Sequence, residues 1–157
     1  MVELKYVDNR MDYLAASGLF KEYAEWLNID LSFQKFEEEL LELSTMYGAP
    51  HGCIILAKYE DEYIGCIAVR KIASGIAEIK RMYVKPRSHQ KGTGTLLLNE
   101  ALAFATKSGY GKIRLDTLNN MLPAIRLYEK AGFYQIPAYY FNPEPTAIYF
   151  EKLCEIV

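Results

Sequence analysis

The sequence predicts an α/β (α+β) protein with a mixed, mostly antiparallel sheet of about seven strands. Three strand-like segments follow one another over residues 53–84 with short polar turns between them. Such short connections are typical of an antiparallel meander. A helical pattern then separates Val84 from the next strand-like segment, 113–118. A connection of that length indicates a crossover between parallel strands, so the sheet has one parallel junction.

The period of the apolar residues assigns the individual elements, because apolar residues recur every two positions in a half-buried strand and every three or four in a helix. The order is β-α-α-β-β-β-α-β-α-β-β. The expected elements are an edge strand over 2–7, helices over 11–27 and 32–47, strands over 53–59, 63–71 and 76–84, a helix from the Gly-rich loop to about 108, a strand over 113–118, a helix over 123–130, and strands over 133–136 and 147–153.

Length and composition narrow the class of protein. The 157 residues have the size of one common domain, so residues 1–157 are expected to form a single one. A net charge of −2 gives no reason to expect nucleic acid, and no apolar run reaches membrane length. The N-terminus lacks a signal-peptide pattern, so the cytoplasm is the expected location. Cys53, Cys66 and Cys154 lie in apolar runs, which favours core thiols over a disulfide or a metal site.

Residues 84–98 join a strand, a basic Gly-containing loop and a helix. The first N–H groups of a helix have no partner within it, and glycines such as Gly92 and Gly94 let an anion approach the backbone. The stretch fits a pyrophosphate cradle, or an ordinary loop before a helix. The strand order argues against a dinucleotide fold, and the missing Gly-Lys-Ser/Thr argues against a P-loop.

Three stretches together resemble the GNAT superfamily of acyl-CoA-dependent N-acyltransferases. Residues 77–86 (AEIKRMYVKP) are similar to the family's fourth strand, and residues 89–94 (HQKGTG) to its Gln/Arg-x-x-Gly-x-Gly/Ala loop. Residues 124–133 (AIRLYEKAGF) are close to its Ala-x-x-Leu-Tyr-x-Lys-x-Gly-Phe helix. The resemblance covers essentially the whole chain. It implies a sheet with helices on both faces, acetyl-CoA (coenzyme A) as cofactor, and N-acetyltransferase activity.

The resemblance also implies which residues bind the cofactor. In the family, loop amides bind the pyrophosphate, and the pantetheine arm pairs with main-chain groups of the fourth strand where two strands splay apart. His89 stands where the family usually has Gln or Arg, and Met121 stands where it often has Asn, a role that Asn119 or Asn120 could take. The predicted cofactor-binding residues are Met82, Tyr83, Val84, His89, Gln90, Lys91, Gly92, Thr93, Gly94, Thr95, Asn119, Tyr128 and Lys130.

Two residues are predicted to be catalytic. Deprotonating an alkylamine with a pKa of about 10.4 costs roughly 4–5 kcal/mol at pH 7, which makes a general base useful. By resemblance Glu78 is the candidate base, acting through a water; a strand carboxylate paired with Lys80 or Arg81 is the alternative. Tyr128 stands where the family places the general acid that protonates the leaving thiolate; a packed helix tyrosine is the alternative.

The predicted function is therefore transfer of acetyl from acetyl-CoA to the primary amine of a small molecule. The acidic second helix (Glu37–Glu39) and the aromatic loop over 138–145 would form the acceptor pocket, although a solvated face is the favoured explanation of the acidic residues. The alternatives are an acetyltransferase acting on a protein lysine or N-terminus, and a non-catalytic acyl-CoA sensor. No nucleic-acid or membrane partner is expected, and the edge strands and aromatic loop would allow a homodimer.

Overall fold

The computed structural model describes residues 1–155, apart from the side chains of Phe33, Gln90 and Lys91. Seven strands form one sheet in the order β1-β2-β3-β4-β5-β7-β6, with β1 at an edge as predicted. Only β4 and β5 pair in parallel, which confirms the predicted mixed sheet with one parallel junction. The strands are β1 (Val2–Tyr6), β2 (Cys53–Tyr59), β3 (Glu62–Ala73), β4 (Ile76–Val84), β5 (Lys112–Leu118), β6 (Tyr134–Ile136) and β7 (Ala147–Leu153).

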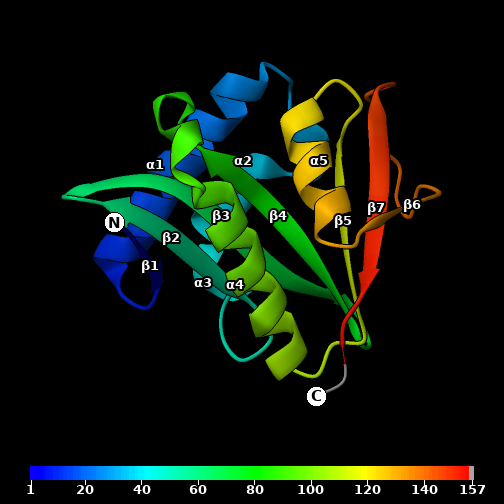
Figure 1. Ribbon diagram of the computed structural model, residues 1–157, viewed down its shortest axis with the longest axis horizontal. Coiled ribbons are helices and arrows are strands. Elements are labelled where there is room, and N and C mark those ends of the chain that lie inside the picture. Colours follow the sequence, from blue (N-terminus) through cyan, green and yellow to red (C-terminus); the bar gives the residue numbers. More distant parts are fainter. Residues whose placement is uncertain (156–157) are drawn as a thin grey trace.

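Helices cover both faces of this sheet (Figure 1). They are α1 (Arg10–Leu27), the 3-10 helix η1 (Ser32–Gln34), α2 (Phe36–Leu41), α3 (Leu43–Met46), the 3-10 helix η2 (Pro86–Lys91), α4 (Thr93–Lys107) and α5 (Leu122–Lys130). Alternate residues of β2 explain the two cores. Ile54 and Leu56 pack with α1, α2 and α3, whereas Ile55 and Ala57 pack with α4 and α5 on the other face.

The predicted second helix, 32–47, is broken into three short pieces. Lys35 adopts a left-handed conformation (φ 56°), which a right-handed helix cannot contain, and Glu42 leaves the helical region at φ −131° and ψ 32°. The prediction of one continuous helix was therefore wrong. Its consequence is functional, because the turn at Lys35 brings Gln34 against the sheet, where Gln34 contacts Lys80 of β4.

The parallel strands β4 and β5 separate soon after they meet. Their pairing involves Ile76, Ala77 and Glu78 of β4 and goes no further along the strand. Beyond it, β4 bulges: Arg81 has φ 56°, and Arg81 and Met82 together oppose a single position of β3. A gap between the two strands is what the resemblance implied, and a cavity opens there.

Candidate active site

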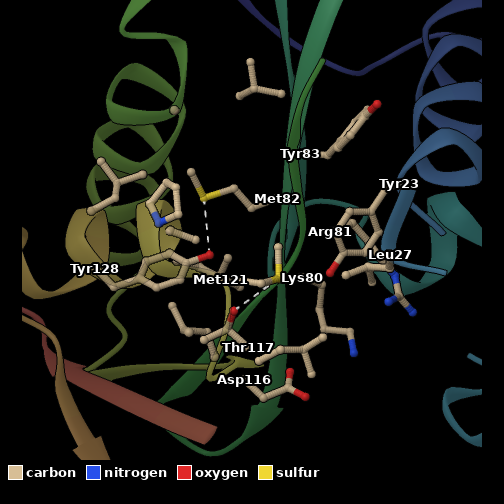
Figure 2. A pocket seen from close by; sticks show the side chains of 18 of the residues that line it. Tyr23, Leu27, Lys80, Arg81, Met82, Tyr83, Asp116, Thr117, Met121 and Tyr128 are labelled. Atoms are coloured by element: carbon tan, nitrogen blue, oxygen red, sulfur yellow. Dashed lines mark hydrogen bonds between the residues drawn. The ribbon is translucent and has the colours of Figure 1, made fainter. Parts of the chain in front are cut away.

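The cavity has a volume of about 590 Å³ and lies between the separated ends of β4 and β5. One end is lined by the start of α4 and by α5, and the other by α1, η1 and the loop between β6 and β7. Figure 2 shows Tyr128 and Met82 on the first side, and Tyr23, Lys80 and Asp116 on the second. The site thus has two ends of different chemistry, described in turn.

The N-terminus of α4 lies at the cavity, where Gly92, Gly94 and Thr95 line the wall. The first intrahelical bond runs from Leu96 N–H to Gly92 O at 3.2 Å, and no described side chain caps the amides before it. Gly92 sits at φ 71°, a conformation that favours glycine. The buried Thr93 hydroxyl likewise has no partner among the described residues. These groups fit an anion such as a pyrophosphate.

His89 has a structural contact that the sequence did not indicate. Its Nε2 lies 2.8 Å from the carbonyl oxygen of Val84, the last residue of β4. Because a carbonyl only accepts, Nε2 carries the proton in this contact and donates it. The exposed ring therefore ties the loop to the strand end while also lining the cavity.

The predicted cofactor-binding residues do not all reach the cavity. Those that line it are Met82, Tyr83, Val84, His89, Gly92, Gly94, Thr95 and Tyr128. Thr93 is buried, Asn119 and Lys130 are exposed, and all three lie outside the lining. Asn120 and Met121 line the cavity instead. The side chains of Gln90 and Lys91 lie outside the described residues.

Tyr128 points its hydroxyl into the cavity from α5. The side chain is 6% exposed and its ring packs against Phe133 and Phe150, with centroids 5.8 and 6.3 Å away. The hydroxyl oxygen lies 3.6 Å from Met82 Sδ, a weak acceptor (Figure 2). Burial raises the pKa of Tyr128 well above that of a free tyrosine, so the group is protonated at neutral pH.

Glu78 lies outside the cavity lining, at the level where β4 and β5 are still paired. Its carboxylate accepts hydrogen bonds from Arg70 Nε at 2.9 Å and from the Tyr139 hydroxyl at 2.5 Å. The expected alternative, a pair with Lys80 or Arg81, was wrong, because Arg70 is the cross-strand neighbour of Glu78 and Arg81 pairs with Glu39. The base role of Glu78 itself stays a prediction.

The acidic second helix makes one buried ion pair. Arg81 donates two hydrogen bonds of 2.9 Å to Glu39, and both side chains are almost fully buried. The solvated interpretation therefore fails for Glu39, although Glu37 and Glu38 are exposed. The pair fixes α2 to the bulge of β4 behind the cavity wall.

A hydrogen-bonded chain at the far end joins four elements, and the sequence did not predict it. Lys80 Nζ donates to Gln34 Oε1 at 3.0 Å, and Gln34 Nε2 donates to the Tyr140 hydroxyl at 3.1 Å. That hydroxyl donates to Asp116 Oδ2, which also accepts from Asn142 Nδ2 at 3.1 Å. The available signal was the charged residues at alternate positions of β4 and β5, among them Lys80 and Asp116.

The described part of the chain holds no cluster of side chains that could bind a metal ion. Within the same residues, no helix is long and apolar enough to cross a membrane.

A separated parallel pair, a helix N-terminus beside it and a buried tyrosine in the cavity are the features that the resemblance to N-acyltransferases implied. The chain matches the Acetyltransferase (GNAT) family over residues 20–133. It is 40% identical over 135 residues to an uncharacterised N-acetyltransferase of Schizosaccharomyces pombe, which covers 83% of this chain and 82% of the relative. This chain belongs to the GNAT family and is an N-acetyltransferase.

Solved structures share the fold. The PaiA N-acetyltransferase from Thermoplasma acidophilum in complex with coenzyme A has a TM-score of 0.76 and 22% identity, over 98% of this chain and 99% of the other. The ribosomal-protein-S18-alanine N-acetyltransferase from Escherichia coli has a TM-score of 0.73 and 17% identity, over 100% and 96%. Because these similarities cover nearly the whole chain, the arrangement of the whole sheet agrees with that of these two structures.

Proposed function

We propose that the protein transfers acetyl from acetyl-CoA to the primary amine of a small molecule by direct attack. The observation that carries the small-molecule acceptor is the hydrogen bonding of the loop between β6 and β7 at the far end of the cavity. Tyr140 of the loop between β6 and β7 contacts both Gln34 of η1 and Asp116 of β5, so the loop spans the cavity end from one side to the other. A protein chain would need an open groove there.

The cofactor end supports acetyl-CoA as the donor. The N-terminus of α4, which no described side chain caps, suits the pyrophosphate. The edge of β4 that no longer pairs with β5 beyond Glu78 suits the pantetheine amides. Bound acetyl-CoA supplies a thioester that an amine can attack and a thiolate that must leave. The solved structure of the PaiA N-acetyltransferase from Thermoplasma acidophilum is a complex with coenzyme A.

Tyr128 and Asp116 carry out the proton transfers. Tyr128 holds a proton that it can give to the leaving sulfur. Asp116 faces the cavity, and its described hydrogen bonds all reach Oδ2, from neutral donors. A carboxylate in that position attracts an ammonium and takes the proton whose loss leaves the nitrogen a lone pair for attack on the thioester, and Asp116 therefore takes the base role in place of Glu78.

Replacing Gly94 by Val is expected to raise the KM for acetyl-CoA roughly 10- to 150-fold, the range for a lost hydrogen bond to a charged group. An added Cβ would lie 3.3 Å from Leu127 Cδ2 and 3.4 Å from Met82 Cε, and the larger valine side chain must displace them or the phosphate. Steady-state kinetics measure the change. Gly18→Val is the matched control, because Gly18 is exposed on α1 with nothing within 4 Å. Equal KM values in the two variants would contradict the cradle.

A thiol-release assay with acetyl-CoA and a panel of acceptors tests the function. We expect small primary amines to be acetylated with a higher kcat/KM than peptides that present an N-terminus or a lysine. The peptides are included because one structural relative is named as a ribosomal-protein acetyltransferase. Faster reaction of the peptides would replace the small-molecule acceptor by a protein one. Binding of acetyl-CoA without consumption with any acceptor would favour the sensor.

A further inference from the structure

Lys80 is a buried cation without a carboxylate partner. Its side chain is only 7% exposed and lines the cavity. Its described hydrogen bond goes to the neutral amide oxygen of Gln34, at 3.0 Å. No carboxylate oxygen of the described residues lies within the 4.0 Å that defines an ion pair. A buried ammonium is strongly disfavoured unless an anion approaches it.

The other cations near this part of the sheet are already neutralised. Arg70 pairs with Glu78, Arg81 with Glu39, and Arg114 with Glu151, each at 2.8–2.9 Å. An anion that enters the far end of the cavity therefore meets Lys80 as the buried positive group still in need of a counterion. Burial, reinforced by the charge of Arg81, lowers the pKa of Lys80, although Glu78 and Asp116 act in the opposite direction.

The opposite charge on the same wall is held away from Lys80. Gln34 and Tyr140, both neutral, bridge Lys80 to Asp116 through three consecutive hydrogen bonds. Figure 2 shows Lys80 and Asp116 as separate groups on the cavity wall. The half-buried carboxylate of Glu144 adds a second negative group to this lining. The far end thus offers one positive and two negative positions rather than an internal ion pair.

We infer that the acceptor carries an anionic group, such as a carboxylate, as well as the amine, and that Lys80 binds this anionic group while Asp116 faces the amine. The inference rests on the proposed small-molecule function. It narrows the substrate class to amino acids and related zwitterionic amines. Lys80 is a specificity-determining residue in this scheme, and the proton transfers stay with Asp116 and Tyr128.

The test compares acceptors that differ only in the charge of one group. Phenylalanine, leucine, β-alanine and 4-aminobutyrate, each beside its primary amide, are assayed by thiol release with acetyl-CoA. The series varies the spacing between amine and carboxylate. An α-amino amide loses its ammonium proton more readily than the amino acid does, so intrinsic reactivity favours the α-amides. A preference for those carboxylates must therefore come from binding.

We expect at least one carboxylate to exceed its amide in kcat/KM by roughly 10- to 150-fold, the range for a hydrogen bond between charged groups. Lys80→Met should abolish that preference by raising the KM of the carboxylate alone, and Lys80→Arg should restore part of it. Lys71→Met, which removes an exposed lysine from β3, is the charge-matched control and should keep the preference. Melting curves and the KM for acetyl-CoA check that each variant is folded.

Three results would overturn the inference. Amides that react as well as their acids would overturn the inference but leave the proposed function intact. An equal loss of kcat for acids and amides in Lys80→Met would make Lys80 a group that acts on the amine. Acetylation of none of these compounds nor of any other amine would remove the proposed function and the inference together.

Discussion

Replacing Tyr128 by Phe is expected to lower kcat about 100-fold or more, the range for loss of a general acid, with little change in the KM for acetyl-CoA. The hydroxyl has Met82 Sδ as a weak partner at 3.6 Å, so its removal leaves no strong donor or acceptor unpaired. The ring keeps its contacts with Phe133 and Phe150. The loss therefore belongs to proton transfer rather than to packing.

The pH dependence follows from the direction of the pKa shift of Tyr128. A tyrosine whose pKa is raised stays protonated as pH rises, so an acid role persists through the neutral and mildly alkaline range. Tyr128→Phe should lower the rate by the same factor from about pH 6 to about pH 9. A thiolate held in the same buried cavity also becomes more basic, which offsets the higher pKa of its donor.

Tyr6→Phe provides the matched control for the lost hydroxyl. Tyr6 donates to Glu100 at 2.8 Å from the edge strand β1, away from the cavity. Steady-state kcat and KM at saturating amine measure both variants. Unchanged turnover in Tyr128→Phe would return Tyr128 to the role of a packed helix tyrosine, and would favour the sensor if turnover were also absent in the parent protein.

The sequence predicted the sheet because its signals are local. Short polar turns between 53 and 84 specify antiparallel neighbours, and the helix between Val84 and strand β5 specifies the parallel one. The glycines at the start of α4 and the Tyr128 motif are likewise contiguous in sequence. Backbone geometry that depends on a few adjacent residues can therefore be predicted from the sequence pattern of those residues.

The far end of the cavity, where the acceptor is proposed to bind, shows almost no such local pattern in the sequence. Gln34 reaches Lys80 only because Lys35 adopts a left-handed conformation, which the sequence 32–47 does not suggest. Tyr140 and Asp116 meet across 24 positions of the chain. Glu78 pairs with Arg70 of the neighbouring strand, and this partner depends on the register of two strands whose pairing contains a bulge. Long-range side-chain contacts of this kind are set by the folded backbone.

Replacing Asp116 by Asn is expected to lower kcat/KM for the amine about 100-fold or more, the range for loss of a general base. Asparagine has the same shape, and its carbonyl oxygen can still accept the bonds from Tyr140 and Asn142 that now reach Oδ2. The loop between β6 and β7 should therefore stay in place. What is lost is the negative charge that faces the cavity.

Glu78→Gln separates the two carboxylates that compete for the base role. Its side chain is 1% exposed and paired with Arg70 and Tyr139, so its neutralisation leaves the half-buried guanidinium of Arg70 without a counterion. We expect a loss of stability of about 1–3 kcal/mol in chemical denaturation and less than about a threefold change in kcat below the transition. The opposite pattern, a large kcat loss in Glu78→Gln with near-normal turnover in Asp116→Asn, would assign the base to Glu78. Proton transfer would then have to run through water between β4 and β5, because the Glu78 carboxylate does not line the cavity.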